Sequence, residues 1–387
     1  MTDRRERVLL LTRNLPPLVG GMERLNWHLA RELSRRAQVR VVAPRGSAAL
    51  APPGVAVAEV PLRPLGWFLL RLQWAAWREA WRWRPDWILA GSGLTALPAW
   101  LAARGLRSRT AAYVHGLDLA VAHPVYRRLW LPALRRMHRV IANSRATAAL
   151  AERAGVESSQ IGIVHPGVEL PGDRSGDDAA MAFRAGLRLG DRPLLVSVGR
   201  LSERKGLREF VAEALPAIVA ACPGTVLLIV GDTPGDALHA RAQTPESIRA
   251  AAARAGVAEN VRLLGTITEF SRLAAVYRAA DVHVFPLREI PNDPEGFGMV
   301  AVEAAAHGLP TVAFAVGGVA DAVAEGESGY LVRPGDQAAL AAAVVRALAA
   351  GRGAWQPACE AFARRFAWPR FGEQVAAGLG LSAGPAD

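Results

Sequence analysis

Short runs of apolar residues alternate along the chain with longer stretches in which apolar positions recur at helical spacing. The short runs predict strands and the longer stretches predict helices. This alternation indicates an α/β fold with parallel sheets, because parallel neighbours need a crossover connection, usually a helix. In the first half the expected strands are Val8–Thr12, Val39–Ala43, Trp87–Ala90, Thr110–Val114 and Val140–Ala142.

The alternation is interrupted at Pro166–Asp178, a stretch rich in Pro, Gly and Asp that is typical of a linker. It then restarts, with expected strands at Leu194–Val198, Val226–Val230, Val261–Leu264, Val282–Phe285 and Thr311–Ala313. A chain of 387 residues is long enough for two domains. We therefore expect two Rossmann-like domains that face each other across a cleft, with the active site between them. The expected parts are an N-terminal Rossmann-like domain (1–170), a linker (171–190), a C-terminal Rossmann-like domain (191–365) and a helix returning to the first domain (366–387).

Composition narrows the class of protein. The net charge of +11 invites a nucleic-acid interpretation, but the basic residues are scattered and no nucleic-acid-binding signature accompanies them. Two cysteines, Cys222 and Cys359, are too few for a disulfide framework. No apolar run approaches the ~18 residues of a membrane span, and Val8–Leu11 is too short for a signal peptide. We expect a cytoplasmic protein, either soluble or attached to the inner face of the membrane at its surface.

Tryptophan is concentrated in one segment. Six of the 11 tryptophans lie at positions 67, 74, 77, 81, 83 and 87. On a helix, Leu70, Trp74, Trp77 and Trp81 form one stripe with arginines beside it, as in helices that lie on anionic membranes. A Rossmann helix also needs an apolar face for its own core. Residues 67–84 therefore either dock on an anionic membrane surface or pack on the first sheet.

The second half holds a pair of cations beyond an expected strand. Leu194–Gly206 reads LLVSVGRLSERKG, which places Arg200 and Lys205 on the loop after the strand. Two cations at this position suit a diphosphate whose charge grows as it leaves. Lys205 is the only lysine in the chain, which indicates a need for a compact ammonium group at this position. The alternative is two ordinary surface cations.

Two carboxylates follow in DPEGFGMVAVEAAAHGLP, at Glu295 and Glu303. Glu295 stands just before an expected helix, whose free N–H groups favour anions. Glu303 lies within the helix among apolar residues, where an unpaired carboxylate would be costly. This favours a ligand, such as a ribose with two hydroxyls, although Glu295 could instead cap the helix and Glu303 could face solvent.

GRLSERKG, EGFGMVAVE and GLPTVAFAVGGVADAV together resemble the retaining GT-B glycosyltransferases of family 4. In the first half, PPLVGGMERLNWHLARELSRR resembles that family's Gly-Gly loop and first helix, YVHGLD its strand-end histidine, and IVHPGVEL its turn before the linker. The segments LREIPNDPEGFG and HPGVE are most similar to the phosphatidylinositol and lipopolysaccharide mannosyltransferase branch. The proline that often follows the late Gly-Gly pair is Ala320 here.

The resemblance implies a role for each matching residue. Arg200 and Lys205 would bind the donor diphosphate and Glu303 the ribose. The transferred sugar would be held by Glu295 with the backbone of Gly296, Phe297, Gly298 and Met299. His115 would lie near the anomeric carbon, Gly20 and Gly21 would let the first loop approach the donor, and Gly265–Ile267 would contact the base.

The resemblance further implies transfer of a hexose, from GDP-mannose or a UDP-sugar, to a glycan or lipid-linked acceptor with retained anomeric configuration. No metal and no cofactor are expected, because Arg200 and Lys205 can stabilise the leaving diphosphate. Three other functions stay open. They are a nucleotide-sugar epimerase or hydrolase, a non-catalytic nucleotide-sugar-binding protein, and a nucleic-acid-binding protein, whose duplex binding would weaken steeply with salt.

Overall fold

The computed structural model describes residues 5–172, 177–233 and 242–381. The chain divides into two compact units: unit 1 is Met1–Gly167 with Trp368–Asp387, and unit 2 is Val168–Ala367. Of the segments discussed above, residues 173–176 of the expected linker and 382–387 of the expected C-terminal helix lie outside the described residues.

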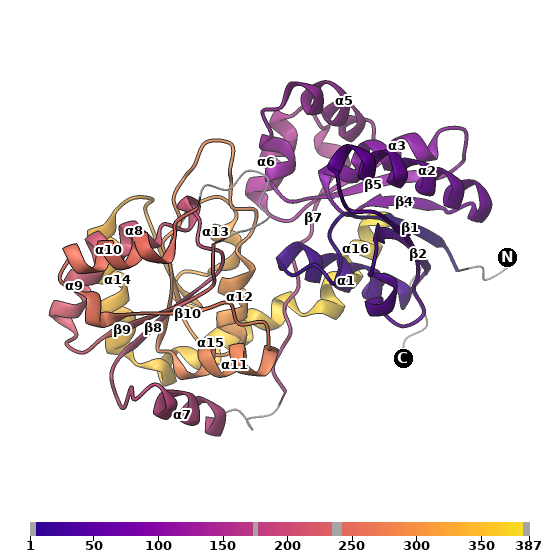
Figure 1. Ribbon diagram of the computed structural model, residues 1–387. Coiled ribbons are helices and arrows are strands. Elements are labelled where there is room, and N and C mark those ends of the chain that lie inside the picture. The colour runs from indigo at the N-terminus through magenta and orange to yellow at the C-terminus, as the bar shows by residue number, and fades with distance from the viewer. Residues whose placement is uncertain (1–4, 173–176, 234–241, 382–387) are drawn as a thin grey trace. The chain divides into compact units, whose positions relative to one another are not determined.

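Unit 1 is built on a parallel sheet in the order β3-β2-β1-β4-β5-β6-β7 (Figure 1). Its described strands are β1 (Arg7–Leu11), β2 (Gln38–Pro44), β3 (Ala56–Val60), β4 (Trp87–Ala90), β5 (Arg109–Val114), β6 (Arg139–Ala142) and β7 (Ile161–Ile163). Val8 to Leu11 of β1 are fully buried, as expected for a parallel strand covered on both faces. β1 lies between β2 and β4, and Val8 pairs with Val39 on one side and Trp87 on the other.

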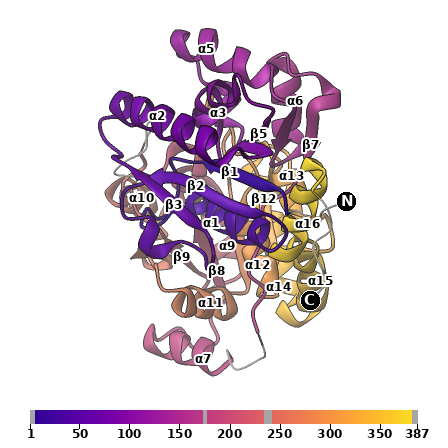
Figure 2. The ribbon, with the colours of Figure 1, turned by 90° about the vertical axis from the view of Figure 1, so that its right-hand side faces the viewer.

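Helices cover both faces of the first sheet. They are α1 (Gly21–Ser34), α2 (Leu65–Trp83), α3 (Ala96–Ala103), α4 (Leu117–Ala120), α5 (Pro124–Arg135), α6 (Arg145–Arg153) and α16 (Trp368–Leu379). α2, α3 and α5 lie on one face, and α1 and α16 on the other (Figures 1 and 2). The C-terminal helix is held against α1 by the ring of Trp368, which stacks on His28 at 3.9 Å between centroids.

Unit 2 repeats the design in the order β10-β9-β8-β11-β12-β13. Its described strands are β8 (Leu194–Val198), β9 (Val226–Val230), β10 (Val261–Gly265), β11 (Val282–Phe285), β12 (Thr311–Phe314) and β13 (Gly329–Val332). Strand order reverses between β8 and β11, which are neighbours although β9 and β10 separate them in sequence. Ligands of open parallel sheets bind beyond the carboxyl ends of the strands at such a reversal.

The helices of unit 2 are α7 (Asp177–Gly186), α8 (Leu207–Glu209), α9 (Leu215–Ala221), α10 (Pro245–Arg254), α11 (Phe270–Ala279), α12 (Met299–Ala306), α13 (Val319–Ala322), α14 (Gln337–Ala350) and α15 (Arg352–Ala363). A π-helical stretch, Phe210–Ala214, joins α8 to α9, so helical structure runs from Leu207 to Ala221 without a break. α7 falls inside the range expected to be linker. Its Ala180 belongs to the same buried cluster as Val276 of α11, so part of that range is core.

Candidate functional site

The single lysine of the chain forms an ion pair across the strand reversal of unit 2. Lys205 ends a short 3₁₀ turn, Glu203–Lys205, that follows β8, and Glu295 lies in the loop that follows β11. Lys205 Nζ is 2.9 Å from Glu295 Oε2, and both side chains are largely buried. Lys205 Nζ also lies 4.5 Å from the centroid of the Phe285 ring, a cation–π contact from β11. The cation predicted after β8 and the carboxylate predicted before α12 thus lie in contact.

Arg204 is a second partner of Glu295. Arg204 Nη1 donates to Glu295 Oε2 at 2.8 Å and to the carbonyl oxygen of Pro294 at 3.1 Å. Its Nε is 3.4 Å from Asp293 Oδ1. One guanidinium therefore fixes three consecutive residues of the loop before α12. Sequence reasoning missed Arg204, although the two acids in DPE were a signal that a basic residue nearby would pair with them.

Burial and neighbouring charges shift the pKa of Glu295, and that of Lys205, in opposite directions. Burial by itself raises the pKa of Glu295, but Arg204 and Lys205 outweigh it and lower that pKa to about 2. Burial lowers the pKa of Lys205, and the neighbouring charge of Glu295 opposes this shift. Glu295 is therefore a carboxylate at neutral pH, able to accept hydrogen bonds but not to donate a proton.

Arg200 is a cation that the chain leaves exposed. It follows Gly199 at the end of β8, and its charge contributes to the lowered pKa of Lys205. Within the described residues its side chain makes no hydrogen bond or ion pair. The backbone beside it is tight, because a Cβ at Gly231 would lie 1.8 Å from the carbonyl oxygen of Gly199. Arg200 thus stands with its donors unused beside the Lys205–Glu295 pair.

The loop that carries Glu295 packs closely against the backbone of Gly317 and Gly318. Gly318 N–H donates to the carbonyl oxygen of Glu295 at 3.0 Å. A Cβ at Gly318 would lie 2.0 Å from the carbonyl oxygen of Gly296, so no side chain fits there. Gly298, at φ 92°, is the N-cap residue of α12. It has no side chain to cap the helix, so N–H groups of the first turn, beginning at Met299, are free to bind a ligand at this edge of the sheet. The side chain of Phe297 is buried, which leaves only its backbone for a ligand.

Glu303 has a partner within the chain. It is buried in α12, and the hydroxyl of Tyr277 on α11 donates to its Oε2 at 3.2 Å. The sequence favours a ligand for Glu303 because a buried carboxylate without a partner is costly. Tyr277 is such a partner, so burial alone does not require a ligand. The ribose-binding role of Glu303 stays a prediction. Ile267 lies half-buried on the loop after β10, at the same edge of the sheet.

In unit 1, His115 follows β5 and is held by two hydrogen bonds. Its backbone N–H donates to Asp118 Oδ2 at 3.0 Å, and its Nε2 lies 3.1 Å from the carbonyl oxygen of Gly91. A carbonyl only accepts, so Nε2 carries a proton and the neutral ring keeps Nδ1 as an acceptor. Gly20 is the N-cap of α1 and Gly21 its first residue, at the carboxyl end of the same sheet.

Unsatisfied polar atoms surround this edge of unit 1. Ser92 Oγ and Tyr126 Oη are buried, and neither has a hydrogen-bond partner among the described residues. Tyr126 Oη lies close to Asp118, because both crowd the position where a Cβ at Gly93 would stand, at 2.6 and 2.5 Å. Buried hydroxyls without partners are uncommon, and a polar ligand would satisfy them. Sequence patterns gave no signal for this group.

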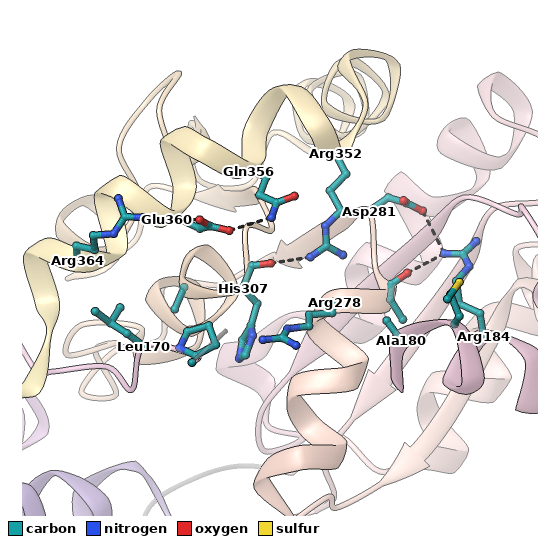
Figure 3. Close-up of a pocket in the computed structure, with 15 residues that line it drawn as sticks. Leu170, Ala180, Arg184, Arg278, Asp281, His307, Arg352, Gln356, Glu360 and Arg364 are labelled. Carbon is teal, nitrogen blue, oxygen red and sulfur yellow. Dashed lines mark hydrogen bonds and ion pairs between the residues drawn. The ribbon is translucent and has the colours of Figure 1, made fainter. Parts of the chain in front are cut away.

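A pocket of unit 2 with a volume of about 710 Å³ lies elsewhere. It is lined by residues that precede β11 and β12, including Asp281 and His307, and so opens at the amino ends of the strands (Figure 3). Two of its four arginines hold backbone carbonyls of the fold. Arg352 donates to the carbonyl oxygens of Ala280 and His307, and Arg184 to that of Ala279. The diphosphate-binding chemistry predicted above is at the opposite edge.

The fold defines a class: two Rossmann-like parallel-sheet units, as in GT-B glycosyltransferases. Comparison with known families agrees. Residues 19–170 match the model described as Glycosyltransferase Family 4, and residues 192–350 match that described as Glycosyl transferases group 1. The chain belongs to this glycosyltransferase family.

Curated relatives support this assignment, and solved structures share the fold. D-inositol 3-phosphate glycosyltransferase of Segniliparus rotundus is 38% identical over 238 residues, which is 59% of this chain and 49% of that protein. The same enzyme of Acidothermus cellulolyticus is 38% identical over 224 residues, 57% and 47% of the two chains. The chain thus spans about half the length of these relatives. Anabaena Alr3699/HepE in complex with UDP has the same fold, with a TM-score of 0.78 and 21% identity over 97% of this chain and 99% of that one. So does sucrose-phosphate synthase from Thermosynechococcus elongatus, with a TM-score of 0.74 and 24% identity over 96% and 98%.

Proposed function

We propose that this protein transfers a hexose from a nucleoside-diphosphate sugar, GDP-mannose or a UDP-sugar, to a glycan or lipid-linked acceptor. The observation that carries the proposal is the Lys205–Glu295 pair at the strand reversal of unit 2, with the exposed Arg200 beside it. Structures similar in fold include one solved with UDP and another with UDP-glucose, which supports a nucleotide sugar as donor.

In the proposed reaction the bond between the anomeric carbon and the diphosphate oxygen breaks, and the acceptor oxygen bonds to that carbon from the same face. The acceptor hydroxyl gives its proton to a phosphate oxygen of the departing nucleoside diphosphate. Arg200 and Lys205 stabilise the negative charge that grows on this diphosphate. They provide the charge that a metal would otherwise supply, so we propose a metal-independent reaction.

Glu295 has a separate role in the proposal. Its low pKa keeps it ionised, and its carboxylate accepts hydrogen bonds from hydroxyls of the transferred sugar. Arg204 positions it, since the same guanidinium holds Glu295 and the carbonyl of Pro294. The first turn of α12 adds N–H donors beside it, and Glu303 receives the ribose hydroxyls.

Unit 1 provides acceptor binding in the proposal. The buried hydroxyls of Ser92 and Tyr126 have no partner among the described residues and are offered to the hydroxyls of the acceptor. The Nδ1 of His115 is the acceptor atom left on that ring and lies at the same sheet edge. Because the relatives named above are inositol 3-phosphate glycosyltransferases, a polyol phosphate belongs among the acceptors to be tried.

A transfer assay tests the proposal. The protein is incubated with GDP-mannose, UDP-glucose or UDP-galactose and with acceptors that include inositol 3-phosphate and lipid-linked saccharides, with and without EDTA. We expect a glycosylated product whose anomeric configuration, read by proton NMR, equals that of the donor, in a yield that EDTA does not reduce. Isomerised or hydrolysed donor formed equally fast without acceptor would indicate an epimerase or hydrolase, and bound but unconsumed donor a binding protein.

A further inference from the structure

α2 presents an apolar face on each side. One side, which includes Phe68, Leu72 and Ala76, is buried in the core of unit 1. The other side carries five large apolar residues that are 39 to 65% exposed: Trp67, Leu70, Trp74, Trp77 and Trp81. We call these five residues the tryptophan face. The alternative that this stripe forms the packing surface of the helix is wrong, because the core is filled from the opposite side.

The tryptophan face gathers five large apolar side chains on the exposed side of one helix. Single exposed apolar residues are common, but a contiguous group of large ones marks an interaction site. The group is also ordered along the helix, because Trp74, Trp77 and Trp81 follow one another at spacings of three and four residues. A helix of 19 residues extends about 28 Å, long enough for all five side chains to meet one flat surface together.

Three arginines each lie over the ring of one tryptophan. The guanidinium of Arg71 lies 4.5 Å from the ring of Trp67, that of Arg78 lies 5.0 Å from Trp74, and that of Arg84 lies 4.5 Å from Trp81. Arg82 is exposed on the same helix. Stacking on the rings keeps these cations at the level of the apolar side chains instead of extending away from them.

Negative charge is absent from the exposed part of this helix. Its one acid, Glu79, has a side chain that is only 13% exposed and is bound by Arg40 and Arg78. The surface therefore combines large apolar rings with positive charge alone. Tryptophan and arginine together suit the head-group region of a bilayer, where rings enter the apolar boundary and guanidinium groups meet lipid phosphates. None of the helices in the described ranges is long and apolar enough to cross a membrane.

We propose that the tryptophan face docks unit 1 on an anionic lipid bilayer, with α2 lying parallel to the membrane surface. The Trp–Arg pairs complement a surface of negative phosphates, and a second copy of this chain would bring like charges together. The inference rests on the proposed function only in that docking would bring the enzyme to a lipid-linked acceptor. Docking itself needs no nucleotide.

Vesicle flotation with the full chain tests docking. We expect the protein to float with phosphatidylcholine vesicles that contain about one third phosphatidylglycerol and to stay unbound with pure phosphatidylcholine. Trp74→Ser with Trp77→Ser should weaken binding at least about tenfold, because two interfacial rings are lost. Raising salt from about 0.1 to about 0.5 M should also weaken it.

A matched control removes two exposed apolar side chains from unit 2. Met181 and Phe270 are 62 and 53% exposed, and Met181→Ser with Phe270→Ser should float as the wild type does. Circular dichroism melting shows whether each variant is folded. Equal binding by the tryptophan variant, or no binding of the wild type to anionic vesicles, would overturn the proposal. So would self-association that the tryptophan variant abolishes, in a protein that does not float. Unchanged nucleotide binding in the tryptophan variant separates a failure of docking from a failure of the proposed function.

Discussion

Lys205 and Glu295 are 90 residues apart in sequence and meet at 2.9 Å between Nζ and Oε2. The strand order of unit 2 produces this contact, because β8 and β11 are neighbours and the loops after them leave the sheet at the same edge. In the free protein Glu295 neutralises a cation that we expect to meet a diphosphate. The pair thus holds the ammonium group in place before the substrate arrives.

Replacing Lys205 by alanine should weaken binding of the nucleoside diphosphate by about 100-fold, since a charge-assisted contact in a largely buried position is lost. Lys205→Arg should not restore it, because a planar guanidinium does not fit a position that packs a point charge between Phe285 and Glu295. Isothermal titration calorimetry measures both variants. Arg254→Ala, which removes an exposed cation from α10, is the control and should bind normally. Tight binding by Lys205→Ala would exclude Lys205 as a diphosphate ligand.

Arg204→Ala should change how activity depends on pH. Arg204 is among the charges that hold the pKa of Glu295 at about 2, so its removal raises that pKa toward the ordinary value of 4.5. Glu295 then becomes protonated at a higher pH, and the acid limb of kcat/KM moves upward. Arg204→Lys should partly restore the profile. Superimposable pH profiles for Arg204→Ala and wild type would show that Arg204 does not position the carboxylate.

His115→Ala should slow transfer while leaving nucleotide binding intact. The ring lies in unit 1, whereas the diphosphate ligands lie in unit 2, so the Kd for the nucleoside diphosphate should be unchanged. The turnover number should fall by about 10- to 100-fold, as expected for a residue that contacts the reacting sugar. Steady-state kinetics and calorimetry on the same preparation separate the two effects. A large loss of nucleotide affinity with normal kcat would reverse the assignment.

The folded protein should lose stability in acid because of buried histidines. Burial lowers the pKa of His28 and His283 from 6.5 to about 3. In the unfolded chain these histidines bind protons below about pH 6.5, whereas in the folded chain they stay neutral down to about pH 3. Their contribution to the free energy of unfolding is therefore largest above pH 6.5 and decreases as the pH falls from 6.5 to 3. Thermal melts at a series of pH values measure the slope. His28→Phe should make it shallower, and a melting temperature constant from pH 7 to pH 4 would contradict this account.

Sequence patterns located the central strands well and the edge strands poorly. β8, β9 and β11 were predicted to the residue, because strands covered on both faces are continuous apolar runs. Three of the four edge strands, β3, β7 and β13, were missed, whereas β10 was predicted to within one residue. β3 and β7 lie at the two edges of the first sheet and are largely half-buried or exposed, so their apolar signal is weak.

Side-chain partners were harder to predict than elements. Spacing indicated Lys205 and Glu295, but it could not show that Arg204, the residue before Lys205, also binds Glu295. Periodicity predicted the stripe of tryptophans but not which face of α2 is buried, because Phe68, Leu72 and Ala76 form a second apolar stripe. The hydroxyl of Tyr126 lies beside Gly93 and Asp118 only because the fold brings these separate segments together.

The central claim is that unit 2 binds a nucleoside-diphosphate sugar through Lys205 and its neighbours. A thermal-shift panel of GDP, UDP, ADP and their sugars tests it most directly, because a ligand that binds only the folded state raises its melting temperature. We predict a clear rise with one nucleotide and its sugar in the wild type, and its loss in Lys205→Ala and Glu303→Ala. No rise with any member of the panel, or an equal rise in Lys205→Ala, would contradict the account.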